Sequence, residues 1–593
     1  MSGGVTVRRD VRIPTGELDV TLSADLFLPE PAGSPVPVLI TVLPYRRDLA
    51  ALGGTPMQRW FAARGYASML VDLRGTGSSD GTPRPPLHQD DVDDALAAID
   101  WAIGQPWCDG TAGMWGDSYG AVMALRAAAA RPNGLKAIVA VQGLMDPETD
   151  FAHPGGTRGA AMPLAIWAKN TLLAQLLPPL DDPADPVEQA RWRRRLEATP
   201  YLVDLFRHGP GHPDWARRRI DAAAIQIPTL CFAGWRDLFA DGMIRAYEQV
   251  RGPKKLVAGP WMHGSPQWSP QAPIDFLNMA LSWWDRWLLG KEAGTEPAVT
   301  FYAQGSRPRW LAAGRWPPGG ADQKVDLGGW QLTEPAEVDH AVGALSGLWA
   351  TPDGPFGLPL DQHDDDVRSI CHTSPPLEGA LLISGPPRVM LDNPWLRVSV
   401  KLVDVDADGR STLICAGLTG TDEAMLAPTT YEIPAGHRLR VVLASGDFPR
   451  VWPYEPSGER RPVATLLSLP ISGETAEIEL QAPEPVAVDF EMREPPVWEI
   501  ANDLINGTVS TRMASHGGCP ARGLWIEQEF VATAHRTRPD ATITCRVSAE
   551  VDGVAVNIDL TATSSAVRAT GRVTRDGDLL LDRTWQAPEG HTR

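Results

Sequence analysis

The chain has no excess of positive charge, and this absence excludes several classes of partner. It contains 54 Lys and Arg against 73 Asp and Glu, which gives a formal net charge of −19 at pH 7. Nucleic acids and anionic membrane surfaces are bound through basic patches. The longest basic run is 191–195, which we interpret as the solvated face of a helix. We therefore expect no nucleic-acid partner and no membrane partner.

Long apolar runs and paired cysteines are also missing. No stretch reaches the length of about 18 apolar residues that a membrane-spanning helix needs. Residues 1–18 lack the charged-then-apolar pattern of a signal peptide. The six cysteines are scattered and include no Cys-x-x-Cys pair, so neither a zinc site nor a disulfide framework is indicated. We expect a cytoplasmic location with reduced thiols.

Four stretches of the chain differ in pattern. Hydrophobic residues make up 43% of the 593 positions, which is enough for a large core and several domains. Residues 1–145 and 219–345 alternate apolar strands with helices, as in a mostly parallel sheet, and the second stretch includes a linker. Residues 146–218 show helical runs and Pro-rich breaks but no clear strand, which suggests a cap. Residues 346–593 carry short alternating segments separated by turns, a spacing that favours a sandwich or jelly roll.

The most informative motif is Gly-Asp-Ser-Tyr-Gly at residues 116–120. A predicted strand, 111–115, comes before it and a helix-forming run, 121–130, follows. This order is typical of a nucleophile elbow, in which the two glycines keep strand and helix from crowding each other. The hydroxyl of Ser118 would then be exposed, and the backbone N–H of Tyr119 could face a developing oxyanion. The motif alone is ambiguous, because a glycine-rich chain also contains it by chance.

A serine hydroxyl needs a base to take its proton and an acid to orient that base. In α/β-hydrolases these groups follow the order serine, acid, histidine along the chain. Two predicted buried strands, 227–234 and 255–259, are followed by polar loops that carry Asp237 and His263. Catalytic groups of parallel sheets lie beyond the carboxyl ends of the strands. Ser118, Asp237 and His263 are therefore the predicted catalytic triad.

His153 is the main alternative base among the twelve histidines. It precedes a Pro-Gly-Gly turn soon after the predicted elbow. Its position before Asp237 breaks the usual order, so we favour His263. The other histidines lie in polar or Pro-rich loops or far downstream.

Several segments together carry a resemblance to one family. Residues 43–47, 71–81, 105–120, 234–237 and 259–263 resemble the cocaine esterase family of serine hydrolases. That family is similar to the X-Pro dipeptidyl-peptidases, the glutaryl acylases and the α-amino acid ester hydrolases. The resemblance continues downstream and so covers nearly the whole chain, through residues 276–290, 373–386, 403–411 and 435–450. It implies an α/β fold with an α/β-hydrolase core, a helical cap insertion and a C-terminal all-β jelly-roll domain.

The resemblance also implies further site residues. Tyr45, which follows a proline, matches the residue whose hydroxyl donates to the oxyanion, beside the N–H of Tyr119. A preorganised donor at that place lowers the barrier by roughly 3–4 kcal/mol. The alternative is a strand-end tyrosine that packs on the core. Trp167 and Phe239 match pocket walls, with core packing as the alternative for both.

The sequence thus predicts a serine hydrolase that cleaves a small-molecule ester or amide through an acyl-enzyme, with no metal or cofactor. A carboxylic ester is favoured, because X-Pro dipeptidyl-peptidases and α-amino acid ester hydrolases or acylases need an acidic cluster for a substrate ammonium. Asp146, Glu148 and Asp150 could form that cluster, although solvated side chains are the simpler interpretation. A second alternative is a non-catalytic binding protein on a hydrolase scaffold. A homodimer is left open.

Overall fold

The alternation of strands and helices in the first half of the chain produces one large mixed sheet. The computed structural model describes residues 3–30, 33–49, 55–156, 161–292, 294, 296–348, 357–457 and 460–587. The main path of the sheet runs through β1 (Gly4–Pro14), β2 (Thr21–Glu30), β4 (Ala67–Asp72), β3 (Val36–Leu43), β5 (Cys108–Asp117), β6 (Leu135–Val141), β7 (Thr229–Gly234), β8 (Lys254–Gly259), β9 (Val299–Gly305), β10 (Arg309–Ala313) and β22 (Ala476–Ile478). Neighbouring strands from β4 to β9 are parallel, and those at both ends of this run are antiparallel.

Helices cover both faces of this sheet. One buried apolar cluster joins the sheet to α2 (Val92–Ile103), α3 (Tyr119–Ala130) and α7 (Ala240–Gln249). Another joins the opposite face to α1 (Thr55–Ala62) and α8 (Phe276–Leu288). The central strands are buried on both sides, as is usual for parallel sheets. Among the described residues, no helix has the length and apolar character needed to cross a membrane.

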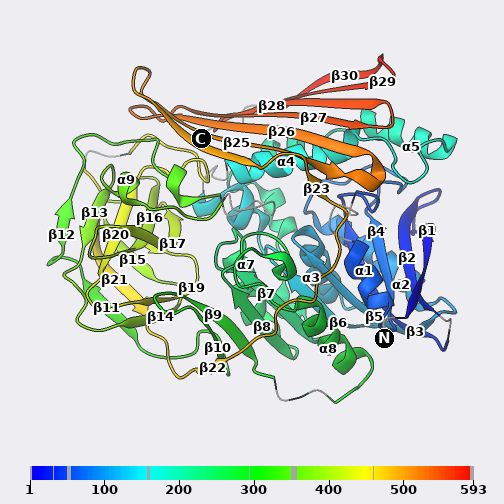
Figure 1. Cartoon of the computed structure of the whole chain (residues 1–593), viewed down its shortest axis with the longest axis horizontal. Helices are drawn as coiled ribbons and strands as arrows, with labels where there is room; N and C mark the ends of the chain where they lie inside the picture. Colours follow the sequence, from blue (N-terminus) through cyan, green and yellow to red (C-terminus); the bar gives the residue numbers. More distant parts are fainter. Residues whose placement is uncertain are drawn as a thin grey trace.

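The chain between β6 and β7 is helical. It holds α4 (Met162–Leu176), α5 (Pro186–Glu197), α6 (Tyr201–Arg207) and short turns such as η3 (Glu148–Ala152) and η5 (Pro213–Arg218). Helix α4 buries residues on all sides, which is typical of a helix enclosed by protein. It lies between the core and a sheet that is built from the last part of the chain (Figure 1).

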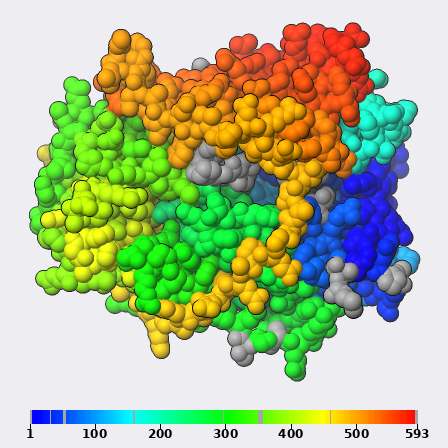
Figure 2. All heavy atoms as spheres, viewed as in Figure 1, coloured from blue at the N-terminus to red at the C-terminus, as the bar shows by residue number. Residues whose placement is uncertain are grey.

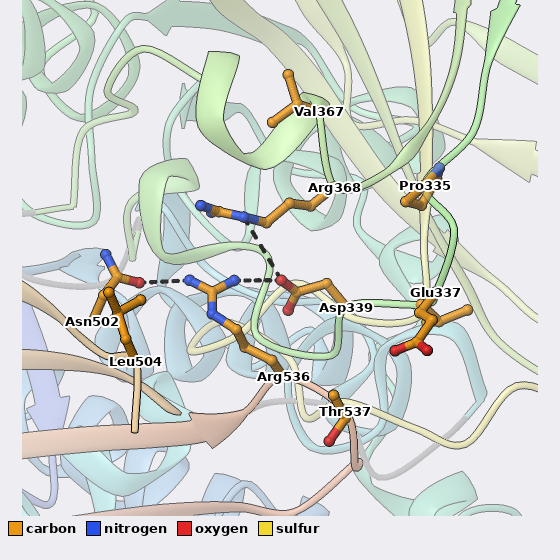
Figure 3. Close-up of a pocket in the computed structure, with 10 residues that line it drawn as sticks. Pro335, Glu337, Asp339, Val367, Arg368, Asn502, Leu504, Arg536 and Thr537 are labelled. Carbon is orange, nitrogen blue, oxygen red and sulfur yellow. Dashed lines mark hydrogen bonds and ion pairs between the residues drawn. The ribbon is translucent and has the colours of Figure 1, made fainter. Parts of the chain in front are cut away.

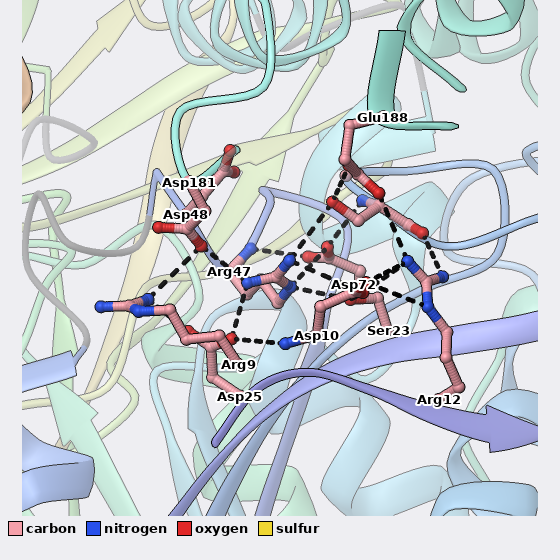
Figure 4. Close-up of polar contacts among 12 residues, drawn as sticks. Arg9, Asp10, Arg12, Ser23, Asp25, Arg47, Asp48, Asp72, Asp181 and Glu188 are labelled. Atoms are coloured by element: carbon pink, nitrogen blue, oxygen red, sulfur yellow. Dashed lines mark hydrogen bonds and ion pairs between the residues drawn. The ribbon is translucent and has the colours of Figure 1, made fainter. Parts of the chain in front are cut away.

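Buried ion pairs tie this helical insertion to the core (Figure 4). The guanidinium of Arg47 lies 2.6 Å from Asp25 of β2 and 2.7 Å from Asp181 of the insertion. Asp72, at the end of β4, accepts the backbone N–H of Arg47 at 2.6 Å. Removing one partner from such a buried group leaves an uncompensated charge and is strongly destabilising. The insertion is therefore fastened at the point where the chain leaves β3.

Two sheets that follow the core face each other across one buried apolar cluster. The first contains β11 (Asp322–Asp326), β21 (Val463–Pro470), β15 (Arg388–Asp392) and β18 (Glu423–Met425). The second contains β12 (Gln331–Thr333), β13 (Ile370–Thr373), β20 (Arg438–Ala444), β16 (Val398–Val405) and β17 (Ser411–Thr419). We call this pair the sandwich. It is joined to the core by β14 (Leu381–Gly385) and β19 (Thr429–Ile433), of which β19 pairs with β9.

The last sheet is a single antiparallel layer, which we call the C-terminal sheet. Its strands are β23 (Glu491–Met492), β25 (Thr508–Cys519), β26 (Leu524–His535), β27 (Ala541–Val551), β28 (Val554–Ala562), β29 (Val567–Arg575) and β30 (Asp578–Ala587), with β24 (Val497–Asp503) also on β25. Along β28 buried and more exposed residues alternate, so one face of the sheet is apolar. That face shares a buried cluster with α4, α5 and α6 (Figure 1).

The division of the all-β region differs from the single domain expected at 346–593. Its described strands form two sheet systems with separate apolar clusters, and the sandwich already begins at Asp322. Between the two, β22 returns to the main sheet and pairs with β10. Strand periodicity marks which residues are buried but not what covers them, and this is why the sequence did not separate the two systems. The jelly-roll topology stays a prediction.

Candidate active site

Ser118 lies in a sharp turn between β5 and α3. Its φ of 56° is in the region that residues other than glycine rarely adopt, and its N–H donates to the carbonyl of Val141 at 2.9 Å. A Cβ on Gly116 would lie 2.7 Å from the Cα of Gly120, so the turn requires glycine there. The predicted elbow therefore has the strained geometry that exposes a serine side chain.

His263 and Asp237 contact each other at the ends of β8 and β7. The distance from His263 Nδ1 to Asp237 Oδ1 is 2.9 Å. Burial raises the pKa of Asp237, and the nearby imidazole acts in the opposite direction. The described residues record no hydrogen bond between Ser118 and His263, but both line one cavity. Because Asp237 occupies Nδ1, Nε2 is the nitrogen left for the serine proton.

Gln142, which the sequence analysis did not single out, fixes the loop that carries the histidine. Its Nε2 donates to the carbonyl of Met262 at 2.8 Å, and its Oε1 accepts the N–H of Gly264. The two residues that flank His263 are thereby tied to the end of β6. No sequence motif marks Gln142, since its role depends on neighbouring strands in the sheet.

The Tyr45 hydroxyl lies between Trp167 and Ser118. It accepts the indole N–H of Trp167 at 2.9 Å, and the Ser118 side chain lies close enough to act on its pKa. Since a phenol has one proton, accepting from the indole leaves that proton for a second partner. Burial raises the pKa of Tyr45 to about 12, so the hydroxyl stays protonated near neutral pH. Tyr45 is therefore held as a hydrogen-bond donor beside the serine.

Arg46, the residue after Tyr45, fixes the loop that carries the tyrosine. Arg46 has a φ of 73°, and its guanidinium donates to Asp48 Oδ2 at 2.6 Å. It also donates to the carbonyls of Leu177 and Pro178, both at 2.7 Å, at the end of α4. The helical insertion and the tyrosine loop thus position each other.

Tyr119 is the first residue of α3, and its ring lies edge-on to that of Tyr45, with 6.1 Å between the centroids. Its hydroxyl donates to Asp91 and accepts the N–H of Leu87, the latter at 2.8 Å. Burial raises the pKa of Asp91 to about 7. The first N–H groups of a helix have no acceptor within the helix. The N–H of Tyr119 is therefore suited to bind a negative oxygen beside Ser118.

Comparison with known families identifies this arrangement. The family model described as X-Pro dipeptidyl-peptidase (S15 family) matches residues 16–265, which include the serine, the acid and the histidine. The X-Pro dipeptidyl-peptidase C-terminal non-catalytic domain matches residues 291–421 and 423–477. The chain is a serine hydrolase that is similar to the cocaine esterases. Both family models end before the C-terminal sheet begins.

Individual relatives agree with this assignment. Cocaine esterase of Rhodococcus sp. (strain MB1 Bresler) is 26% identical over an alignment of 539 positions, which covers 76% of this chain and 92% of the relative. A CocE/NonD family hydrolase from Staphylococcus aureus has a similar fold, with a TM-score of 0.61 at 15% identity, over 79% of this chain and 97% of that one. An α-amino acid ester hydrolase gives a TM-score of 0.56 at 18% identity, over 79% and 96% of the two chains.

The cavity of this hydrolase has a volume of about 780 Å³ and is largely apolar. Aromatic rings follow one another along one side. Phe239 lies edge-on to His263 at 5.2 Å between centroids, Phe151 contacts Phe239 at 5.8 Å, and Trp167 contacts Phe151 at 6.0 Å. Trp167 and Phe239 had been expected here, whereas Phe151 had not. Such a lining suits an apolar part of a substrate.

The cavity also has a polar part. Four buried side-chain atoms that line it have no hydrogen-bond partner among the described residues: Thr41 Oγ1, Gln58 Oε1, Trp115 Nε1 and Asp117 Oδ1. Burial raises the pKa of Asp117 to about 6, and His263 acts against this shift. Asp117 thus places a carboxyl group directly before the nucleophile. The sequence analysis did not single out Asp117, because the Gly-x-Ser-x-Gly motif places no requirement on the residue before the serine.

One wall of the cavity comes from a part of the chain outside the family models. Val488, Phe490, Met492 and Ile526 contribute apolar surface there, and Gln528 is also part of the lining. No described residue of the sandwich lines the cavity. The resemblance implied a β-domain beside the active site, and the part of the all-β region that lines the described cavity is the C-terminal sheet with the chain that enters it.

The other candidates from the sequence lie away from the cavity. His153 hydrogen-bonds through Nε2 to the carbonyl of His208 at 3.0 Å, and its ring contacts Trp215. The three acidic residues considered as an ammonium site are ion-paired with arginines rather than solvated. Asp150 pairs with Arg245 at 2.5 Å, and Asp146 and Glu148 pair with Arg219 at 2.7 and 3.3 Å.

A second cavity, of about 630 Å³, lies where the sandwich meets the C-terminal sheet (Figure 3). In it Arg536 contacts Asp339 and donates to Asn502 at 2.5 Å, and Arg368 lies 3.8 Å from Asp339. Its described lining includes no serine, cysteine or histidine. We interpret it as a junction between the two β regions. Throughout the described part of the chain, no three His, Cys, Asp or Glu side chains gather as metal ligands would.

Proposed function

We propose that this hydrolase cleaves a carboxylic ester through an acyl-enzyme on Ser118. The Ser118 oxygen attacks the carbonyl carbon while His263 takes the hydroxyl proton, and His263 then gives that proton to the leaving alcohol. Water repeats the sequence and releases the acid. Asp237 holds the imidazole tautomer and stabilises the imidazolium. The observation that carries the proposal is the 2.9 Å contact between His263 and Asp237 in a cavity shared with Ser118.

The negative oxygen of the tetrahedral intermediate would be bound by two donors, the Tyr45 hydroxyl and the Tyr119 N–H. Support comes from the protonated, fixed hydroxyl of Tyr45 and from the place of Tyr119 at the start of α3. Donors that are already oriented stabilise developing charge without reorganisation. Trp167 and Phe239 would contact the substrate from the aromatic side of the cavity.

Ester cleavage is favoured over the peptidase alternative because the predicted ammonium cluster is neutralised. The carboxylates of Asp146, Glu148 and Asp150 pair with Arg219 and Arg245. One observation favours a second candidate, an α-amino acid ester hydrolase. Asp117 has an oxygen without a hydrogen-bond partner in the described cavity and could accept a substrate ammonium. X-Pro dipeptides and amides are the further alternatives, and a non-catalytic binding role is disfavoured by the complete triad.

Ser118→Ala tests the proposal. We expect complete loss of labelling by a fluorophosphonate and loss of ester turnover, because the Ser118 hydroxyl is the proposed nucleophile. The free energy of unfolding should change by at most about 1 kcal/mol, since the hydroxyl contributes little packing. The measurements are probe labelling, urea unfolding and rates with p-nitrophenyl esters, aminoacyl esters and X-Pro anilides.

Ser269→Ala is a matched control, because Ser269 lines the same cavity at its rim. Turnover by Ser118→Ala at the wild-type rate would remove Ser118 from the mechanism. A faster rate with aminoacyl esters than with neutral esters would select the second candidate. A homodimer and a cytoplasmic location stay predictions.

A further inference from the structure

The chain between β22 and β23, residues 479–490, crosses the surface of the core before it enters the C-terminal sheet. Figure 2 shows this segment, in amber, running up the front face of the molecule. Its backbone is held by the core, since the carbonyl of Gln481 accepts the N–H of Asp275 at 3.0 Å and that of Glu484 accepts Gln267 Nε2 at 2.9 Å. We call residues 479–492 the strap. Its course is fixed on the side of the core that carries α1 and α8.

The end of the strap is fixed by close packing on β25. Met492 pairs with Gly517, and Glu491 pairs with Gly518. A Cβ on Gly517 would lie 2.7 Å from Met492 Sδ and 2.9 Å from Phe490 Cζ. Only glycine at this position lets both side chains approach the strand so closely. Phe490 and Met492 are therefore held in place at the cavity.

The C-terminal sheet is anchored on its other side by the helical insertion. Its apolar face shares a cluster with α4, and Lys169 of α4 donates to Gln528 Oε1 at 2.5 Å. Arg522, in the turn before β26, donates to Asp181 Oδ1 at 2.5 Å. The same Asp181 binds Arg47 of the core, two residues after Tyr45. The wall made by this sheet is thus positioned relative to the catalytic groups by contacts on both sides.

On the basis of the proposed function, we propose that the strap and β26 form the specificity wall of the active site, which selects esters with a bulky apolar group. Val488, Phe490, Met492 and Ile526 supply the wall, and Ser118 opens into the same cavity. A volume of about 780 Å³ lies well within the roughly 300–1,000 Å³ of pockets that enclose drug-sized ligands. A small acyl or alcohol group would leave this wall uncovered.

The exposure of Phe490 supports the assignment. Its side chain is 40% exposed although it borders the cavity. An apolar group that covers this ring removes apolar surface from water, which favours binding in proportion to the area covered. Apolar pockets discriminate by about 10- to 200-fold for each methylene gained or lost. The wall is therefore expected to act on the ratio of rates between bulky and small esters.

Phe490→Ala and Met492→Ala test the inference in the full-length protein. The probes are two series of p-nitrophenyl and alkyl esters, one that lengthens the acyl group from acetyl to octanoyl and one that lengthens the alcohol of an acetate. In one of the two series, we expect each variant to lower the ratio of kcat/KM for the bulky ester to that for the small ester by about tenfold. Ile505→Ala, an equally apolar but 96% exposed position in the same sheet, should leave both ratios within twofold.

A variant that adds bulk to the wall and a labelling measurement distinguish a change in selectivity from damage to the catalytic groups. Ile526→Trp adds bulk to the wall and should lower rates for the bulky esters only. A small fluorophosphonate should still label Ser118 to completion in every variant, which shows that the catalytic groups are intact. Unchanged ratios in both series, or an equal fall for bulky and small esters, would overturn the inference. Absence of labelling and of ester turnover in the wild type would instead refute the proposed function.

Discussion

The sandwich and the C-terminal sheet are both antiparallel, yet they are stabilised differently. The sandwich buries its apolar residues between its own two sheets. The C-terminal sheet is one layer, and the helical insertion over the active site supplies its second layer. A sheet must cover its apolar face, and the covering element determines what else the sheet contacts. The sandwich has its own core and, in the described part of the chain, does not line the cavity. The C-terminal sheet lacks such a core and forms one wall of the cavity.

The largest expected effect comes from removal of the C-terminal sheet. Ending the chain after Ile478 would expose the apolar residues of α4 and of neighbouring helices that now share its cluster. Large exposed apolar patches lead to aggregation. We expect insoluble or inactive protein, measured by expression yield, size-exclusion chromatography and fluorophosphonate labelling. A soluble monomer with full activity on small esters would break the comparison and make the sheet a separable module.

A smaller effect is expected from Lys401→Met in the sandwich. The ammonium of Lys401 is buried 3.2 Å from Asp447 and 3.8 Å from Asp365. Loss of one member of a buried ion pair costs about 3–5 kcal/mol where the remaining charge is uncompensated, and we expect the lower end of this range because Asp447 also pairs with Arg450. Ester selectivity should not change, since the sandwich does not line the cavity in the described part of the chain.

Urea unfolding and the ratio of rates for bulky and small esters measure the two effects of Lys401→Met. Lys291→Met is the control, because the Lys291–Asp285 pair is largely exposed. Pairs of that kind contribute about 0–1 kcal/mol. A change in ester selectivity without a loss of stability would contradict the separation of the two β regions.

The smallest expected effect is a change in how the stability of the α/β core, which both β regions flank, depends on pH. Burial raises the pKa of Asp91 to about 7, with Asp94 adding to the shift and Tyr119 and Arg126 opposing it. Because the folded pKa lies above the usual 3.8, the folded state binds more protons between these values. Asp91 therefore makes stability fall as pH rises through this window, by at most about 1.4 kcal/mol per pH unit.

Asp91→Asn should remove this dependence while keeping an acceptor for the Tyr119 hydroxyl. Its stability relative to the wild type should then rise between pH 5 and pH 7, as measured by urea unfolding at each pH. Equal slopes for both proteins would show that Asp91 does not titrate in this range. Asp93→Asn, at the surface of α2, whose N-cap is Asp91, is the control.

The positions proposed as the catalytic triad could be singled out because each is marked by local sequence. Ser118 is bracketed by glycines, and Asp237 and His263 each follow an apolar run that forms a buried strand. The order serine, acid, histidine along the chain then linked the three residues as one candidate triad. Tyr45 was found through the resemblance, since a proline-tyrosine pair at a strand end is not specific by itself.

The wall of the cavity could not be predicted in the same way. Phe490 and Ile526 lie more than 370 residues from Ser118 in the chain, in segments that read as ordinary strands. Their place depends on which surface covers the C-terminal sheet, and strand periodicity does not contain that information. Gln142 and Phe151 were missed for a related reason, because their contacts are made between elements rather than within one. The arginine partners of Asp146 and Asp150 are likewise distant in sequence.

Gly517 gives this enzyme a single position from which its substrate range can be altered. The residue carries no side chain, yet the approach of Phe490 and Met492 depends on that absence. Any larger residue would push both side chains away from β25 and reshape the mouth of the cavity without changing a residue near the serine. If the proposed wall sets the substrate range, chemistry and selectivity are encoded in separate parts of the chain. Variation in the last fifth of the chain can diversify the esters accepted while the catalytic groups stay as they are.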